Sequence, residues 1–232
     1  MRNKLSYIFV GLTLSACLMA SCQRQKHKGG RTDTYSSGVI SFASDESFSP
    51  IIGEEKQVFE SIYTKATVKP IYTNELDAIN MLLNEKVCLA ITSRNFKDKE
   101  LKNLQDRRFM PRAIKIAYDG LALIVNKENT DTCISVNDIK RILNGQAKNW
   151  SDISPGSKRG EVLLVFDNNK SSAVHFAEDS ILGGKPITNK NVAATNKTAD
   201  VIDYVEHTPN AIGIIGSNWL NDKRDSTNLT FN

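Results

Sequence analysis

The sequence predicts an α/β protein with mainly parallel sheets, divided between two small lobes. From Gly38 onward, short β-branched and apolar runs alternate with segments whose apolar residues recur at helical spacing. Some runs, such as VCLAIT at 87–92, are almost wholly apolar, which is typical of strands buried on both faces of a parallel sheet. About ten short strands in roughly 195 residues fit two small sheets better than one large sheet.

Strands and helices alternate along this whole region. Asn74 is a candidate N-cap, because its side chain can accept a backbone N–H from the first turn of the helix that follows. The stretch 113–126 (AIKIAYDGLALIVN) is divided at Asp119-Gly120 into two apolar runs. The expected strands are 39–43, 66–72, 87–92, 162–166, 191–195 and 211–215. The expected helices are 51–65, 74–86, 97–107, 136–143, 172–181 and 199–206.

Composition and charge exclude several classes of protein. The chain has 232 residues, 40% hydrophobic and 24% charged, which is typical of a globular protein and excludes a disordered chain or a polytopic membrane protein. The net charge is +4, but six positive and no negative residues lie among the first 31. Removing those six leaves −2 for the rest, so the folded region offers no basic face to nucleic acid.

Residues 1–22 are interpreted as a lipoprotein signal peptide. A basic start precedes an apolar run of about 16 residues, shorter than the roughly 20 that a membrane-spanning helix needs. Small residues precede Cys17 and Cys22, and both segments resemble a lipobox, in which cleavage frees a cysteine for lipidation. We favour Cys22 over Cys17, because cleavage there leaves a start that is polar at once. An ordinary signal peptide without a lipid is the alternative. Residues 23–37 are expected to form a flexible tether.

Neither a metal nor another cofactor is expected. Cys88 and Cys133 remain in the exported region, where an oxidising compartment permits a disulfide. Cys88 lies in an apolar run, which favours a buried thiol. The chain has no CxxC pair, and its three histidines are scattered, so a zinc site is not predicted. We do not expect an enzyme. Of the three histidines, only His175 is close in sequence to the serines of the polar turns 44–50, 92–95 and 167–172, and no GxxxxGK[ST] loop is present.

Three strand-to-helix turns are rich in hydroxyl and charged side chains. Helix N-termini at the carboxyl ends of parallel strands offer free N–H groups, so these turns are candidates for binding an anion. Arg94 adds a guanidinium fork that suits an oxyanion. Each turn alone is better explained by helix capping, but three such turns at one edge of the sheets favour an anion site. The turns are 44–50 (SDESFSP), 92–95 (TSRN) and 167–172 (DNNKSS).

Six motifs stand in one order between Gly38 and Asp222. They are VISFASDESFSP, LAITSRNF, AYDGLALIVNKEN, SVNDIKRILNGQAKNWSDI, LLVFDNNKSSAVHF and TPNAIGIIGSNW. The Asn-Gly and Asn-Trp spacing around Trp150 is the most specific of them. Together they resemble the PstS-like phosphate-binding lipoproteins of ABC transporters, a group of type II periplasmic solute-binding proteins.

The resemblance implies a two-lobed periplasmic-binding-protein fold of type II, with a cleft that encloses an oxyanion. It assigns 38–120 plus 208–232 to lobe 1 and 121–207 to lobe 2. It implies a monomeric receptor, lipid-anchored on the periplasmic side of a bacterial membrane, that passes inorganic phosphate or a similar oxyanion to the permease of an ABC transporter. Asp45, Glu46 or Asp119 would accept a proton from the ligand. The expected ligand-binding residues are Ser44, Asp45, Glu46, Ser47, Ser93, Arg94, Asp119, Lys170, Ser171 and Ser172.

The chain departs from this family in its candidate ligand site. Asp45 and Glu46 stand where the family has small hydroxyl residues, and a carboxylate beside a desolvated dianion is repulsive unless the anion carries a proton. Phe166 replaces the family's arginine, and Lys170 is the candidate substitute for its charge. Two alternatives follow: a different oxyanion or small organic acid, or a binding-protein fold reused as an envelope interaction or sensor module.

Overall fold

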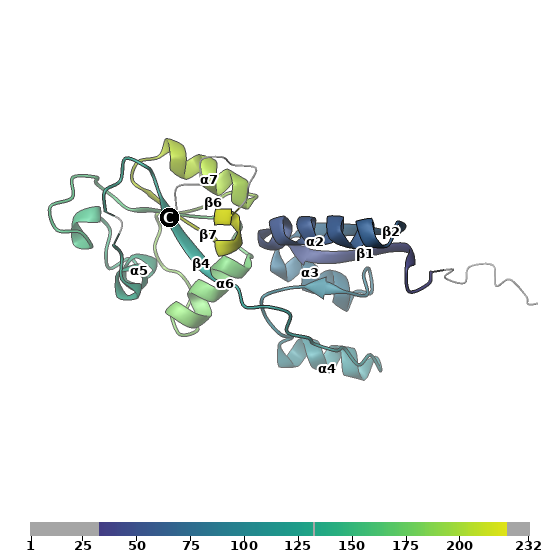
Figure 1. Ribbon diagram of the computed structural model, residues 1–232. Helices are drawn as coiled ribbons and strands as arrows, with labels where there is room; N and C mark the ends of the chain where they lie inside the picture. Colours follow the sequence, from purple (N-terminus) through teal and green to yellow (C-terminus); the bar gives the residue numbers. More distant parts are fainter. Residues whose placement is uncertain (1–32, 132, 222–232) are drawn as a thin grey trace, which may run out of the picture.

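The computed structural model describes residues 33–131 and 133–221 and divides them between two lobes that lie side by side (Figure 1). One lobe contains a three-stranded sheet of order β2-β1-β3, and the other a four-stranded sheet of order β4-β7-β5-β6. All strand pairs are parallel except β4 with β7. The expected two-lobed α/β fold with mainly parallel sheets is therefore confirmed. The candidate lipidation sites Cys22 and Cys17 lie outside the described residues.

The first lobe is built around β1, which pairs with β2 along nine residues and with β3 along only two. The expected strand 87–92 is thus reduced to a two-residue edge strand, and Cys88 beside it is exposed instead of buried. The elements are β1 (Ser37–Asp45), η1 (Glu46–Phe48), α2 (Ser49–Ile62), β2 (Lys65–Thr73), α3 (Glu75–Leu83), β3 (Ala90–Ile91) and α4 (Asp98–Asp106).

The second lobe follows the alternation that the sequence predicts. Helix α5 has the expected bounds, because Ser135 caps it and Asp138 completes a capping box. The expected helix 172–181 is divided into a short α-helix and a π-helical turn. The elements are β4 (Leu121–Val125), α5 (Val136–Leu143), η2 (Trp150–Asp152), β5 (Leu163–Phe166), α6 (Ser172–Phe176), η3 (Ala177–Ile181), β6 (Val192–Ala194), α7 (Thr198–His207), β7 (Ala211–Gly216) and η4 (Ser217–Asn221).

The assignment of 208–232 to the first lobe is wrong for strand β7. This strand lies between β4 and β5 at the centre of the second sheet, and all six of its residues are buried. An apolar run of that kind needs cover on both faces, which only the interior of the larger sheet provides. Within the described residues, the chain therefore passes from one sheet to the other once, through residues 107–120, which lack regular secondary structure from 109 onward.

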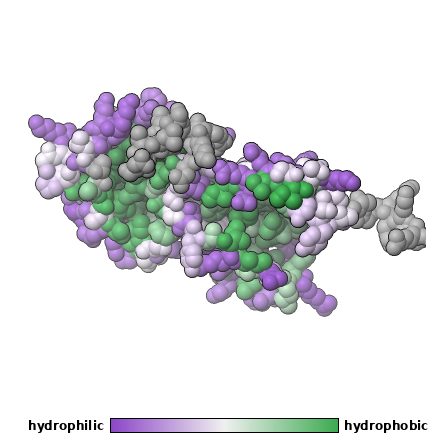
Figure 2. All heavy atoms as spheres, viewed as in Figure 1, coloured by the Kyte–Doolittle hydropathy of each residue, from purple (hydrophilic) through white to green (hydrophobic). Residues whose placement is uncertain are grey.

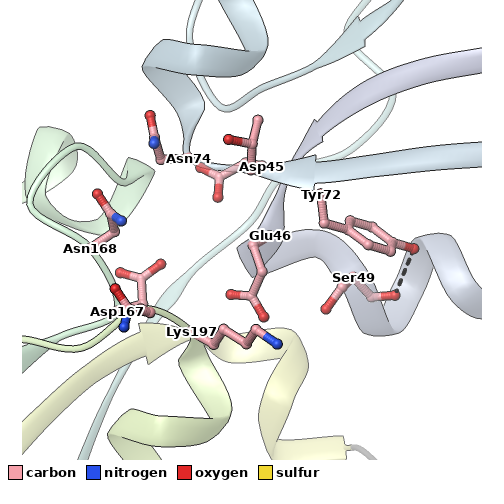
Figure 3. Close-up of a pocket in the computed structure, with 10 residues that line it drawn as sticks. Asp45, Glu46, Ser49, Tyr72, Asn74, Asp167, Asn168 and Lys197 are labelled. Atoms are coloured by element: carbon pink, nitrogen blue, oxygen red, sulfur yellow. Dashed lines mark hydrogen bonds between the residues drawn. The ribbon is translucent and has the colours of Figure 1, made fainter.

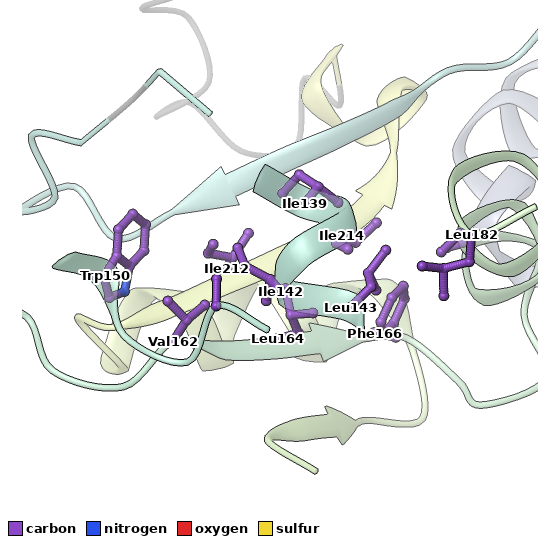
Figure 4. Close-up of a cluster of buried hydrophobic side chains, with 13 residues drawn as sticks. Ile139, Ile142, Leu143, Trp150, Val162, Leu164, Phe166, Leu182, Ile212 and Ile214 are labelled. Carbon is purple, nitrogen blue, oxygen red and sulfur yellow. The ribbon is translucent and has the colours of Figure 1, made fainter. Parts of the chain in front are cut away.

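The main hydrophobic core fills the second lobe (Figure 4). Thirteen buried residues form its larger cluster, among them Trp150, Leu164 and Phe166, each with 0% of its surface exposed. Phe166 packs in this core. An interaction surface at the mouth of the cleft would require this side chain to be exposed there, and it is fully buried. The buried cluster of the first lobe consists of only three residues, Ala43, Ala78 and Val87.

Candidate functional site

A pocket of about 450 Å³ lies where both lobes present the carboxyl ends of their strands (Figure 3). The first lobe contributes the ends of β1 and β2, and the second lobe the turns after β5 and β6. This arrangement is typical of ligand sites in open α/β sheets. The residues that line the pocket are Asp45, Glu46, Ser49, Tyr72, Thr73, Asn74, Asp167, Asn168, Asn196 and Lys197.

Helix capping holds the turns around this pocket in place. Asn74 accepts a hydrogen bond from the Asp77 N–H at 2.9 Å, and Ser171 accepts one from the Val174 N–H at 3.4 Å. Helix α7 differs, because its N-cap residue is Lys197, whose side chain makes no capping bond. A lysine has no acceptor atom for this purpose, so the first N–H groups of α7 need an acceptor from elsewhere in the molecule.

That acceptor comes from the opposite lobe. Oε2 of Glu46 accepts hydrogen bonds from the Thr198 N–H at 3.1 Å and from the Thr198 hydroxyl at 2.9 Å. Oδ2 of Asp45 accepts one from the Ser172 N–H at 3.2 Å, while its Oδ1 accepts one from the Ser47 N–H at 3.1 Å. Two adjacent carboxylates of the first lobe therefore contact the first residues of α6 and α7 in the second.

Hydroxyl and indole groups extend this contact between the lobes. The hydroxyls of Ser47 and Ser172 lie 3.2 Å apart, and both residues are buried. Trp219 donates its indole N–H to the Ser47 carbonyl at 2.9 Å. Ser47 therefore contacts two separate segments of the second lobe, which fixes the position of the first loop relative to both.

The pocket is acidic. Burial raises the pKa of Asp45 and of Glu46, although hydrogen bonds from Ser172 and Thr198 partly oppose the shift. Burial and the two neighbouring carboxylates raise the pKa of Asp167 to about 6. Oδ1 of Asp167 is buried and accepts no hydrogen bond from a described residue. Lys197 is the one cationic side chain among the lining residues, so a multiply charged anion meets repulsion here.

A second contact between the lobes centres on Glu75, which is buried at the start of α3. Its carboxylate lies 3.1 Å from Nδ1 of His175 on α6, and it accepts hydrogen bonds from the Ser93 N–H and hydroxyl. Arg94 lies beside it, but its guanidinium forms a two-pronged pair with Glu100 at 2.8 and 2.9 Å. Ser93 and Arg94 therefore belong to this network and do not line the pocket.

The ten expected ligand residues divide into three groups. Asp45 and Glu46 line the pocket, and Ser47, Ser171 and Ser172 are buried next to it. The structure does not bring the other five to the pocket. Ser44 donates its hydroxyl to the Asp45 carbonyl, Ser93 and Arg94 contact Glu75, and the side chains of Asp119 and Lys170 are exposed.

Sequence reasoning missed the contributions of β2 and of the turn after β6. Tyr72 and Thr73 are the last residues of β2 and Asn74 follows it, while Asn196 and Lys197 come after β6. The rule that selected the other turns therefore also applies at the ends of these two strands. Asp167 and Asn168 lie in the candidate turn 167–172, but the expected ligand contacts of that turn are Lys170, Ser171 and Ser172. Counting every polar turn after an expected parallel strand finds the whole lining except Tyr72, which lies in the strand 66–72 itself.

Comparison with known families agrees with the fold and its cleft. The family model described as the PBP superfamily domain matches residues 29–230. The chain belongs to this PBP superfamily.

Similar members of the superfamily carry phosphate in their names. The chain is 24% identical over 220 residues to a phosphate-binding protein PstS of Staphylococcus aureus (strain USA300), covering 94% of this chain and 66% of the relative. It is 28% identical over 134 residues to PstS of Staphylococcus haemolyticus (strain JCSC1435), covering 57% of this chain and 42% of the relative. The chain thus spans two thirds or less of the length of these curated relatives.

A solved structure supports the fold. The chain aligns with a putative phosphate ABC transporter substrate-binding protein with bound phosphate from Clostridium perfringens, with a TM-score of 0.66 and 19% identity. The alignment covers 78% of this chain and 71% of that one. At this identity the likeness shows the fold alone.

Three further features bear on the classes of function. Among residues 33–131 and 133–221, no cluster of histidine, cysteine and carboxylate side chains is arranged to hold a metal ion. None of the helices in the same ranges is long and apolar enough to cross a membrane. Cys88 and Cys133 are both free thiols and both exposed, one in each lobe.

Proposed function

We propose that this chain is a lipid-anchored, monomeric solute-binding protein that captures inorganic phosphate in the periplasm and delivers it to the permease of an ABC transporter. One observation carries the proposal. The N–H groups of Ser47, Ser172 and Thr198 converge on the cleft, and each donates to a carboxylate, which is itself an oxyanion group. The cleft is therefore built to hold oxygen atoms that bear negative charge.

The acidic lining favours phosphate over an anion without a proton. Asp45, Glu46 and Asp167 repel a fully deprotonated dianion, whereas an oxyanion that carries a proton donates a hydrogen bond to a carboxylate. Inorganic phosphate carries such a proton near neutral pH, and sulfate does not. The hydroxyls of Ser47, Ser172 and Thr198 complete the set of donors in this proposal.

Titration calorimetry tests the assignment on protein that has been denatured and refolded to remove bound solute. Phosphate and arsenate are expected to bind, and sulfate at least tenfold more weakly. Ser47→Ala combined with Ser172→Ala should weaken phosphate binding at least tenfold, while the exposed Ser151→Ala should leave it unchanged. The absence of phosphate binding, or equal affinity for sulfate, would contradict the proposal.

A second candidate function is an interaction or sensor module in the cell envelope that binds no anion. The observation in its favour is that Asp45 and Glu46 already occupy donors of the second lobe. The buried position of Phe166 removes the other argument for this candidate. Calorimetry distinguishes the two functions, because the interaction module requires that phosphate, arsenate, sulfate and citrate all fail to bind.

A further inference from the structure

The carboxylate of Asp45 lies between the two lobes and accepts hydrogen bonds from both. One oxygen contacts the Ser47 N–H of its own lobe at 3.1 Å, and the other contacts the Ser172 N–H of the second lobe at 3.2 Å. The side chain is fully buried. Backbone N–H groups of two lobes therefore hold one oxyanion between them, as they would hold the oxyanion of a solute.

Glu46 makes the equivalent contact with a different helix. Its Oε2 takes the N–H and the hydroxyl of Thr198 at the start of α7, where the N-cap residue Lys197 makes no side-chain bond. Without a side-chain cap, the first N–H groups of a helix lack an acceptor. The Glu46 carboxylate of the opposite lobe therefore serves as the cap of α7. Charged acceptors form stronger hydrogen bonds than neutral ones.

We propose that Asp45 and Glu46 act as an internal anion, which holds the two lobes together without solute and competes with the solute for the same N–H groups. The proposal rests on the proposed function for the identity of the competing oxyanion. The two carboxylates are the specificity-determining residues of the cleft, because any ligand must take donors that they occupy. The sequence suggested the same two residues, with Asp119 as an alternative, as proton acceptors for the ligand.

The charges around the pocket determine what displacement requires. When an oxyanion takes the Ser172 and Thr198 N–H groups, both carboxylates have to turn away from them. Asp167 then repels the displaced carboxylates, and Lys197 is the one cationic lining residue that can attract them. Burial raises the pKa of Asp45 and so already disfavours its charged form. The negative charge of a bound oxyanion would disfavour the charged form further. Phosphate should therefore bind the natural chain weakly, and removal of the two carboxylates should strengthen binding.

The chain offers its own reporter positions for a test of closure. Cys88 lies in the first lobe and Cys133 in the second, and both thiols are free and exposed. Spin labels on these two cysteines report the distance between the lobes by pulsed electron resonance. The full chain is used in detergent, with Cys17→Ser and Cys22→Ser so that only these two positions react, and with and without inorganic phosphate.

The variant Asp45→Ala with Glu46→Ala is compared with Glu54→Ala with Glu55→Ala. The control removes the same charge from two exposed positions of α2. In the starting protein and in the control, the distance distribution should be narrow and unchanged by phosphate. In the cleft variant it should be longer and broader without phosphate and should shorten when phosphate is added. Its dissociation constant for phosphate should be at least tenfold lower, and its preference for phosphate over sulfate should decrease.

Two outcomes would overturn the internal anion: a starting protein that closes only on addition of phosphate, or a folded cleft variant that stays closed without it. Circular dichroism establishes that the variant is folded. A cleft variant that opens but binds no phosphate would support the internal anion and contradict the proposed ligand, so the two proposals fail separately.

Discussion

The two lobes of this molecule are stabilised in different ways. The second lobe has a core of thirteen buried residues, with Trp150 and Phe166 at 0% exposure. The cluster of the first lobe holds only Ala43, Ala78 and Val87, and four further apolar residues are buried outside it. Figure 2 shows hydrophobic residues at the surface of the first lobe. Val58 and Ile62 on α2 are 55% and 66% exposed. Since apolar burial is the main favourable term in folding, the second lobe carries most of the stability.

This difference teaches what the cleft contributes to the first lobe. Its first loop is held by the Ser172 N–H, the Thr198 N–H and the Trp219 indole, all of which belong to the second lobe. Its helix α3 is held by His175 in the same way. The small lobe thus depends on polar contacts with its larger neighbour for order that its own core does not supply.

The largest expected difference between the lobes appears when one aromatic side chain is removed from each. Trp150→Ala should lower the free energy of unfolding by about 4 kcal/mol, because the indole is fully buried and also donates to the Asn210 carbonyl at 3.0 Å. Phe59→Ala in the first lobe should cost less than about 1 kcal/mol, since that ring is 38% exposed. Urea unfolding measures both, and equal losses would break the comparison.

The next effect is a change in how stability depends on pH. The pKa of Asp167 is raised to about 6 from 3.8, so the native state binds the proton more tightly than the unfolded chain does. Stability contributed by the protonated form is present below about pH 4 and is lost as the pH rises to about 6. Asp167→Asn should therefore raise the free energy of unfolding by about 2 to 3 kcal/mol at pH 7.5 and leave it unchanged near pH 4.

Urea unfolding at several pH values checks this prediction. Glu55→Gln is the matched control, because Glu55 is an exposed carboxylate on α2 of the first lobe, and its replacement should change little at any pH. A gain for Asp167→Asn that is the same at pH 4 and pH 7.5 would show that the carboxylate is not destabilising through its charge.

The smallest expected difference comes from the same substitution, Ile to Val, made once in each lobe. Ile142→Val should lower the free energy of unfolding by about 1 kcal/mol, because Ile142 is fully buried. Ile62→Val should change it by less than about 0.3 kcal/mol, since Ile62 is 66% exposed at the end of α2. Thermal unfolding followed by calorimetry measures the difference. A larger loss at Ile62 would mean that a further surface covers α2 in solution.

The sequence predicted those parts of the fold that depend on neighbouring residues. Helix α5 has the expected bounds because Ser135 and Asp138 cap it locally, and Asn74 caps α3 as expected. Strands depend on partners, which the sequence does not show. Residues 113–118 are mostly apolar, although Lys115 interrupts them, and 121–125 are wholly apolar, but only the second stretch pairs with a neighbour, β7, and forms a strand.

The candidate site was predicted only in part, again because local patterns do not show contacts between distant residues. The rule that polar turns gather at the carboxyl ends of parallel strands found Asp45, Glu46 and Ser172. Their contacts join residues more than 120 positions apart, and no local pattern indicates them. Arg94 was placed in the ligand site because its guanidinium suits an oxyanion. Glu100, six residues later, provides a carboxylate that the guanidinium binds instead.

The single passage between the two sheets has a topological consequence. Within the described residues, the sequence of each lobe is one uninterrupted block, joined by an exposed stretch that includes Ile114, Ile116 and Tyr118. Two crossings would define an axis for opening, whereas a single crossing also permits rotation of one lobe about the connecting segment. A cut in this stretch would turn the protein into a complex of two fragments, whose association constant would measure directly the free energy stored in the cleft.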